Sequence, residues 1–305
     1  MPKDSDLVKK MTTDTILARI DFFISVLAHT RSKSTVDTYR RSLGVFTLWV
    51  DEQGGSIELS QKNLEKYPVY LRTQRKVTSR TIKIYLTALR GFFTFLSKEG
   101  LLHHDPLVNL NIKPDTSGEG KARAILTKEE IKSLFEASKG EQIVKLRDRA
   151  ILCCMLLEGI TETEVSNCNY GDLEHTLMGE ELRICGSGGP LCIPLDQRTY
   201  RSLTAYLTKR NETLRSQDPL FISHGPREVG ERLKVRSVRS RMRVLLDRAK
   251  VLRTEVSPQS LSHTSIYLQI LNGVTREQLR ERTRPWRLFH RIEYLKSRGL
   301  IDPSY

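Results

Sequence analysis

Apolar residues recur every three or four positions through the first hundred residues, which is the spacing of one helix face. Pro68 weakens the third of these series, because an interior proline removes a backbone hydrogen bond. Gly54-Gly55 and Gly100 mark the ends of the second and fourth series. Four helices are therefore predicted, with apolar faces over residues 16–26, 36–49, 60–74 and 82–96.

Residues 112–124 are rich in glycine, proline and charge and show no periodicity, so they predict a linker between two domains. The polar first residues predict a flexible leader. The expected organisation is a leader over 1–13, an all-α domain over 14–111, the linker over 112–124 and a second domain over 125–305.

The second domain is expected to be mainly helical with one small β-hairpin. Thr127 and Glu130 have the spacing of a capping box. The apolar run from Lys145 to Gly159 predicts a buried helix. Two short β runs, 181–185 and 191–195, flank a glycine turn, and further helices are expected over 197–211, over 234–250 and after Pro258.

The charge balance then suggests a partner. The 305 residues include 50 Lys and Arg against 36 Asp and Glu, which gives a net charge of +14. A surplus of this size favours binding to a polyanion, with double-stranded DNA as the first expectation. An acidic membrane surface, or simple solubility, would account for the same sum.

Several other classes are disfavoured by the sequence. No apolar run approaches the roughly 18 residues that span a bilayer, and the N-terminus shows no signal segment, so a cytoplasmic protein is expected, nucleoid-associated if prokaryotic. The five cysteines lack metal-ligand spacing and are expected to be reduced thiols, so no metal is predicted. The glycine turn at 186–190 lacks the lysine of a phosphate loop, so neither a nucleotide nor another cofactor is expected.

Hydroxyl and basic residues in the first domain are candidates for phosphate binding. Two helix starts place hydroxyls beside free backbone N–H groups, which is a common phosphate site. The alternative is that these residues are ordinary caps and solvated charges. The candidates are Ser34, Thr35, Arg40, Arg41, Ser79, Arg80, Lys83 and Arg90.

Further candidates lie in the linker and the second domain. At 100° per residue, Arg236, Arg239 and Arg243 share one face of the helix over 234–250, next to its apolar stripe. This stripe suits a phosphate backbone, and a solvated face is the competing interpretation. The linker holds the basic residues Lys121 and Arg123.

Three stretches carry a resemblance to a known family. Residues 34–43 (STVDTYRRSL) and 81–93 (TIKIYLTALRGFF) resemble the signature helices of the core-binding domain of tyrosine recombinases, and 99–110 resembles that domain's exit. Residues 256–294, with one tyrosine in the last expected helix, resemble the family's active-site segment. The resemblance implies a core-binding domain and a catalytic-type domain that close around DNA as a clamp, with Lys121 and Arg123 of the linker near the DNA backbone.

The resemblance also implies catalytic positions. In the family a tyrosine attacks a phosphodiester while arginines, a lysine and histidines stabilise charge. Tyr294 falls at the nucleophile, and His263 at the second histidine of the His-x-x-Arg-His box. The remaining positions lack the expected groups: Thr161 for the first arginine, the glycine turn 186–190 for the lysine, Gln259 for the first histidine, Ser262 for the second arginine and Pro285 for the later histidine or tryptophan.

Replacement groups lie near the tyrosine. His290 precedes Tyr294 by one helical turn and is the best substitute acid or base. An arginine cluster could be a DNA or partner surface, and it could rebuild a phosphate clamp, with two of its members, Arg284 and Arg287, taken as DNA-binding candidates. The cluster comprises Arg276, Arg280, Arg282, Arg284, Arg287 and Arg291.

Two functions follow. The first is a DNA-binding pseudoenzyme of the recombinase fold that acts as an accessory or regulatory factor in DNA recombination or mobile-element biology. The alternative is an active, divergent recombinase that cleaves DNA through a 3′-phosphotyrosine at Tyr294. The partners expected are double-stranded DNA and either an active recombinase or a second copy of this chain. Leu295, Leu300 and Ile301 would be available for docking on a neighbouring copy.

Overall fold

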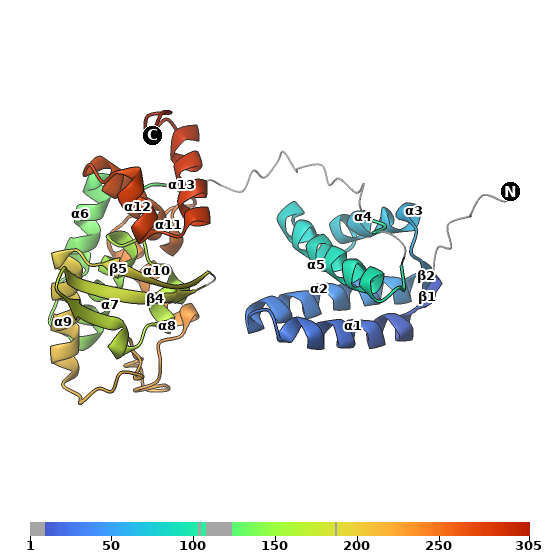
Figure 1. Cartoon of the computed structure of the whole chain (residues 1–305), viewed down its shortest axis with the longest axis horizontal. Coiled ribbons are helices and arrows are strands. Elements are labelled where there is room, and N and C mark those ends of the chain that lie inside the picture. The colour runs from blue at the N-terminus through green and yellow to red at the C-terminus, as the bar shows by residue number, and fades with distance from the viewer. Residues whose placement is uncertain (1–9, 103–104, 108–123, 187) are drawn as a thin grey trace. The chain divides into compact units, whose positions relative to one another are not determined.

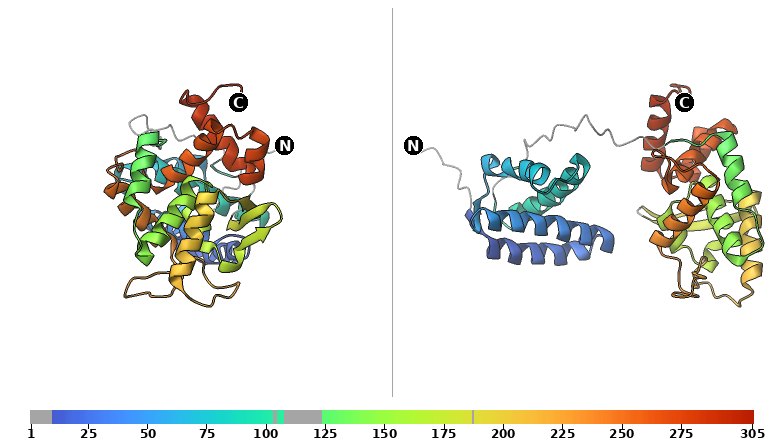
Figure 2. Two further views of the ribbon diagram at one scale, coloured as in Figure 1. Left: turned by 90° about the vertical axis from the view of Figure 1, so that its left-hand side faces the viewer. Right: turned by 180° about the vertical axis from the view of Figure 1, so that it is seen from behind.

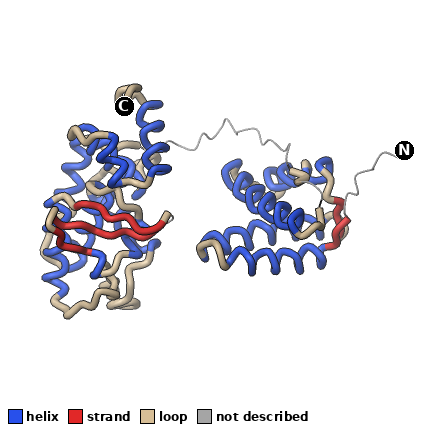
Figure 3. The backbone as a smooth tube through the Cα atoms, viewed as in Figure 1, coloured by secondary structure: helices blue, strands red, loops and turns tan. Residues whose placement is uncertain are grey.

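The computed structural model describes residues 10–102, 105–107, 124–186 and 188–305. The chain divides into two compact units at residue 120, and each unit is considered by itself (Figure 1). Helices dominate both units, and each also holds one small antiparallel sheet (Figure 3). The mainly α fold with a small sheet in the second unit is therefore confirmed. The expected linker, including Lys121 and Arg123, lies outside the described residues apart from Ala124.

The first unit is a helical module around a core of aromatic and aliphatic side chains. Phe46 lies in this core beside Trp49, Tyr67 and Phe93, with ring centroids 5.2–6.1 Å apart. Aromatic pairs at such distances add to the stabilisation from burial. The helices are α1 (Thr13–Ala28), α2 (Lys33–Glu52), α3 (Gln61–Leu64), α4 (Lys66–Thr73) and α5 (Ser79–Lys98).

Hydroxyl caps fix where the long helices begin. Thr78 Oγ1 accepts a hydrogen bond from the Thr81 amide at 3.3 Å, so α5 begins directly after this cap. In α2 the cap is Ser32, two residues earlier than expected, and Ser34 and Thr35 lie inside the first turn. The third helix expected from the sequence is divided into α3 and α4. Pro68 falls in the first turn of α4, where a backbone N–H would have no hydrogen-bond acceptor within the helix.

The expected leader is wrong for residues 10–12. These residues form strand β1 (Lys10–Thr12), which pairs antiparallel with β2 (Ser56–Glu58), and Met11 lies opposite Ile57. Met11 is only 2% exposed and belongs to the core of the unit. The first domain is therefore not purely α, because one apolar side chain in a polar stretch fastens the start of the chain to the loop after α2.

Shortening this side chain should measure the value of the strand. Met11→Ala is expected to lower the free energy of unfolding of the first unit by about 2 kcal/mol, since it leaves a cavity in a packed core. Lys10→Ala is the matched control, because Lys10 is an exposed residue of the same strand. Chemical denaturation of the full chain, followed by the fluorescence of Trp49 in the first unit, tests both variants. Equal effects for the two variants would mean that the strand contributes nothing beyond its backbone.

The second unit contains eight α-helices among the described residues. Its central helix is α7, which is buried from Ala150 to Leu156 and packs against α9, α10 and α11. Figure 2 shows the C-terminus at the end of this unit opposite the loops that follow α9. The helices are α6 (Lys128–Ala137), α7 (Ile143–Leu156), α8 (Glu162–Asn167), α9 (Gln197–Arg210), α10 (Val235–Arg248), α11 (Pro258–Leu271), α12 (Arg276–Arg282) and α13 (Pro285–Ser297).

The sheet of the second unit has three strands where two were predicted. Its order is β3 (Leu173–Thr176), β4 (Gly179–Gly186), β5 (Gly189–Pro194), antiparallel throughout. The alternation of apolar and polar residues faces Leu182 and Ile184 inward, which places the glycine turn between β4 and β5 beside α8. The additional strand β3 is short and largely polar, so its sequence carries no apolar alternation.

The residues after Tyr294 fold back onto their own unit. Leu295 is buried in a small cluster with Ile266, Leu279, Leu288 and Ile292, and Leu300, Ile301 and Tyr305 pack against it. Tyr305 also donates its hydroxyl to the Val274 carbonyl at 2.7 Å. The expectation that Leu295, Leu300 and Ile301 are available for a neighbouring copy is therefore wrong for this conformation.

The cysteines are free thiols. Cys153, Cys154 and Cys168 are buried, and burial raises the pKa of all three, which keeps them protonated. Cys185 and Cys192, on β4 and β5, are exposed. Among the helices that the structure describes, none has both the length and the apolar character needed to cross a membrane.

Candidate functional site

A pocket of about 440 Å³ lies in the second unit where α8, α10, α11 and α13 meet the turn after β4, and it is called the site pocket below. It brings together the replaced positions Thr161, Gln259 and Ser262, whereas Pro285 lies outside it, exposed at the start of α13. The lining residues are Thr161, Glu162, Thr163, Glu164, Gly186, Arg239, Gln259, Ser262, His263, Trp286, Arg287, His290 and Arg291.

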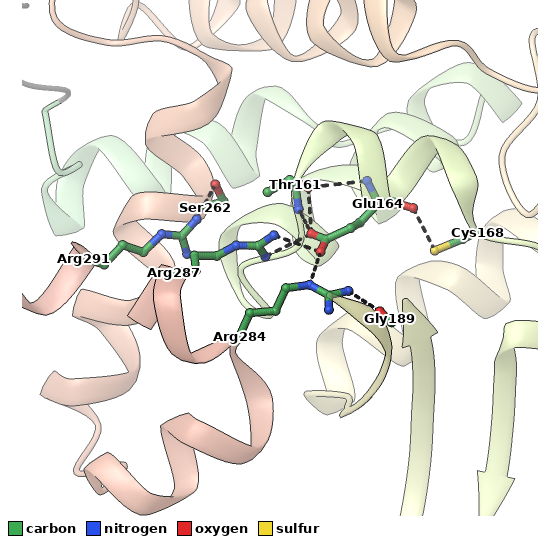
Figure 4. Close-up of polar contacts among 8 residues, drawn as sticks. All are labelled: Thr161, Glu164, Cys168, Gly189, Ser262, Arg284, Arg287 and Arg291. Carbon is green, nitrogen blue, oxygen red and sulfur yellow. Dashed lines mark hydrogen bonds and ion pairs between the residues drawn. The ribbon is translucent and has the colours of Figure 1, made fainter. Parts of the chain in front are cut away.

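A buried carboxylate organises the pocket. Glu164, on α8, is 2% exposed and accepts hydrogen bonds from both Nη atoms of Arg287, at 3.0 and 2.9 Å (Figure 4). Nε of Arg284 approaches the same carboxylate at 3.3 Å. Thr161 donates its amide and its hydroxyl to Glu164 Oε2 at 2.9 and 2.7 Å. These four residues are called the Glu164 cluster.

The cluster keeps Glu164 ionised. Burial by itself raises the pKa of this carboxyl, but the hydrogen bonds and the charge of Arg287, together with the Thr161 bonds, lower the pKa below its usual value. Local sequence prepares the same arrangement. Thr161 and Glu164 form a reciprocal capping box at the start of α8, so the carboxylate is also held by its own helix.

Arg284 fills the space left by the glycine turn. Its Nη2 donates to the Gly189 carbonyl at 2.8 Å, and the residue is 5% exposed. Gly188 has φ +111, and a Cβ there would lie 3.0 Å from Nη1 of Arg284. The turn is therefore glycine-rich partly because the guanidinium packs directly on its backbone.

Arg291 approaches the other replaced position. Its Nη2 donates to Ser262 Oγ at 3.1 Å, and both residues are buried. Gly159 lies beside this guanidinium, and its φ of +74 and the distance of 3.1 Å from an added Cβ to Ser265 Oγ both favour glycine there. The guanidinium thus lies between α11 and the end of α7 and faces the pocket.

The tyrosine faces another way. Tyr294 lines a separate cavity of about 540 Å³ with Tyr267, Leu271, Arg298 and other residues, and the described residues around the site pocket do not include it. Its ring contacts the His263 ring at 6.4 Å between centroids. His263 lines the site pocket, so the tyrosine lies behind the histidine.

The three catalytic candidates are therefore separated within one region. His290 is exposed and lines the site pocket, one turn before Tyr294 on α13. His263 lies between pocket and tyrosine. Among the described residues, no group of three His, Cys, Asp or Glu side chains is placed to hold a metal ion.

The arginines of α10 lie on an exposed face. Arg236, Arg239 and Arg243 are all exposed, and Arg239 also pairs with the buried Glu162 at 3.4 Å. Arg241, on another face, donates to Asp148, which Arg147 also contacts. The exposed stripe therefore remains a candidate phosphate contact, with Arg239 reaching the rim of the site pocket.

Most basic candidates of the first unit are exposed as well. Arg40 lies 4.0 Å from the Asp37 carboxylate, and Arg90 donates to the Leu107 carbonyl at 3.3 Å. These contacts are at the surface and leave both charges accessible. The exposed candidates are Ser34, Arg40, Arg41, Arg80, Lys83 and Arg90, and the half-buried ones are Thr35 and Ser79.

Two expected DNA contacts need correction. Arg284 is buried against Glu164 and Gly189, so it is not a surface residue. Arg287 points into the pocket and is held by Glu164, so the backbone of a duplex could reach it only through the pocket. The sequence interpretation missed Glu164, although the Thr-x-x-Glu spacing at 161–164 is a capping-box signal.

Comparison with known proteins agrees with this geometry. Residues 20–100 match the family of the phage integrase N-terminal SAM-like domain. The tyrosine recombinase XerD of Listeria monocytogenes is 26% identical over 200 residues, 63% of this chain and 66% of the relative, just under two thirds of its length. The tyrosine recombinase XerC of Pseudomonas syringae is 25% identical over 236 residues, 76% of this chain and 75% of the relative.

Solved structures share the fold. The XerH recombinase bound to a difH substrate after cleavage has a TM-score of 0.76 at 16% identity, covering 95% of both chains. The lambda integrase dimer on a core site has a TM-score of 0.65 at 13% identity, covering 95% of this chain and 79% of that one. The fold is therefore that of the two-domain recombinases. Residues 20–100 match the phage integrase N-terminal SAM-like domain, and the relatives and solved structures that the chain resembles are tyrosine recombinases and integrases.

Proposed function

We propose that this protein binds double-stranded DNA through the recombinase fold without cutting it, and acts as an accessory or regulatory factor in recombination or mobile-element biology. The observation that carries the proposal is the separation of Tyr294 from the site pocket, whose arginine positions 161 and 262 hold hydroxyl groups. The nucleophile and the charged groups therefore do not face a common space.

The energetics support loss of cleavage. Phosphodiester attack by a phenol builds negative charge, and removal of a single charge-stabilising donor commonly costs about 2.7–4 kcal/mol of transition-state stabilisation. Here Thr161, Ser262 and the glycine turn stand where the resemblance places three cations. The guanidinium of Arg287 also donates two hydrogen bonds to Glu164, which shares its charge between Arg284 and Arg287. Arginines held in this way stabilise developing charge less than unpaired ones would.

DNA binding is supported by features outside the pocket. The net charge is +14, and exposed arginines form a stripe on α10. Structures with the same fold were solved bound to DNA, among them XerH on difH and lambda integrase on a core site. We therefore propose that the duplex contacts this stripe in the second unit and, in the first unit, the exposed basic residues.

A nicked suicide duplex tests the absence of cleavage, because a released short strand traps any covalent intermediate. Incubated with the full chain, it should give no covalent protein–DNA adduct on a denaturing gel. Tyr294→Phe should bind the duplex with unchanged affinity. An adduct formed by the unaltered chain and absent from Tyr294→Phe would contradict the proposal.

That contrary result would support the alternative, an active divergent recombinase. The observation in its favour is the contact between Tyr294 and His263, since the histidine also lines the site pocket. In that case His290→Ala should reduce adduct formation, because His290 is the exposed acid or base of the pocket.

A further inference from the structure

Three arginines of one short segment lie at the three places where the resemblance expects cations. Arg287 shares Glu164 Oε2 with Thr161, which occupies the first arginine position. Arg284 contacts the glycine turn, where the lysine is expected. Arg291 contacts Ser262, which occupies the second arginine position. Each missing charge is thus matched by a guanidinium that arrives from residues 284–291.

We propose that Arg287 and Arg291 form a binding site for one backbone phosphodiester of DNA inside the site pocket, built on a different element from the one the family uses. The inference rests on the proposed function and names the ligand of this pocket. Arg284 is a positioning residue, because it is buried, donates hydrogen bonds to Glu164 and to the Gly189 carbonyl, and so holds the start of α13 in place.

The helix presents both donors to one space. Arg287 and Arg291 are spaced by four, so their side chains leave α13 on one face, whereas Arg284 is the residue that precedes the helix. Figure 4 shows Arg287 directed toward Glu164, Arg291 toward Ser262 and Arg284 toward Gly189. A phosphate in the pocket would therefore meet two guanidiniums one helical turn apart.

Donor capacity is sufficient. A guanidinium carries five N–H groups in a planar fork. The contacts of Arg287 with the described residues commit two of these groups to Glu164, which fixes the plane of the fork. The remaining N–H groups of Arg287 can serve a ligand, and Glu164 pre-orients them at no cost in side-chain freedom on binding.

The charge of the pocket matches a monoanion. Its lining includes three guanidiniums, those of Arg239, Arg287 and Arg291, and two carboxylates, those of Glu162 and Glu164. One positive charge is therefore in excess when the histidines are neutral. A phosphodiester carries one negative charge, and Arg239, which is 54% exposed, lies on the route from solvent.

Two probes test the site, inorganic phosphate and duplex DNA. Phosphate should raise the melting temperature of the full chain above that in sodium chloride of equal ionic strength. Arg287→Gln, which keeps an amide to bond Glu164, should weaken phosphate binding at least tenfold. Arg276→Gln is the control, because it removes the same charge outside the pocket, where Arg276 donates to the Tyr305 carbonyl. This variant should bind phosphate as tightly as the unaltered chain. No phosphate effect in the unaltered chain would overturn the proposal without any variant.

DNA is tested by the salt dependence of affinity. Loss of one phosphate contact should reduce the slope of log affinity against log salt by about 0.9 for Arg287→Gln and for Arg291→Gln, but not for Arg276→Gln. If Arg291→Gln fails to fold, Arg287→Gln decides. If phosphate raises the melting temperature but both variants keep the salt slope of the unaltered chain, the ligand of the pocket is free phosphate and the DNA assignment is overturned. Absence of any DNA binding by the unaltered chain would instead refute the proposed function, while the phosphate measurement would still report on the pocket.

Discussion

Replacing Glu164 by leucine is expected to lower the free energy of unfolding of the second unit by about 3–5 kcal/mol, because the buried guanidiniums would lose the carboxylate that balances their charge. Arg284 is 5% exposed and Arg287 is also largely buried, so water cannot take the place of the lost partner. The capping box of α8 is lost in the same variant. Denaturant unfolding of the full chain, followed by circular dichroism, measures the change.

Glu162 provides the matched control. It lies two residues away on α8 and is equally buried, but its partner Arg239 is 54% exposed. Glu162→Leu should therefore lower the free energy of unfolding much less, because water can hydrate the guanidinium of Arg239 once the carboxylate is gone. If the two leucine variants unfold alike, the stability of this region comes from helix capping and packing instead of from the Glu164 cluster.

The loss of folding stability at acid pH is an independent test of the Glu164 cluster. The pKa of Glu164 is lower in the folded chain than in the unfolded one, so its contribution is complete above the unfolded value of about 4.3 and is lost as pH falls through the folded value. Glu164→Gln should remove this part of the pH dependence. An unchanged loss of stability at acid pH in that variant would mean that other carboxyls cause it.

DNA affinity is expected to fall by a factor of about 10³ or more between 50 and 200 mM salt, as it does for proteins with six or more phosphate contacts. Fluorescence anisotropy with a labelled duplex across this range measures the slope. The reason is the release of counterions by the exposed arginines and lysines of both units. A change of less than tenfold would mean that the basic surface is not a duplex-binding surface.

Two triple variants locate the contacts. Arg236, Arg239 and Arg243 changed together to glutamine should reduce the slope by up to about 2.7, since each lost phosphate contact contributes about 0.9. Arg198, Arg201 and Lys209 are exposed on α9 and provide the same change of charge on another helix. Equal slopes for the two triple variants would remove α10 from the interface.

Local patterns were sufficient to predict most helices. The stripe of α5, from Ile82 to Leu96, is amphipathic and capped by Thr78, so period and cap agree. The strand β1 could not be predicted, because three residues with a single apolar side chain have no measurable alternation. Its stability comes from pairing with residues 56–58, a contact that local patterns do not contain.

The site was only partly predictable for a related reason. Family resemblance identified Thr161, Ser262 and Tyr294 as positions of interest, and the structure brings the first two to one pocket. Periodicity indicates which face of α13 a residue occupies, but it cannot tell a buried arginine from a solvated one. That distinction depends on Glu164, whose hydrogen bond to Arg287 spans 123 residues of sequence.

The Glu164 cluster also has a consequence for folding. Its capping partner Thr161 is three residues away, whereas Arg284 and Arg287 follow by 120 and 123 residues. During synthesis Glu164 therefore leaves the ribosome well before Arg284 and Arg287. Contacts of such separation close large loops and form slowly. The pocket is thus completed only in the late steps of folding of the second unit.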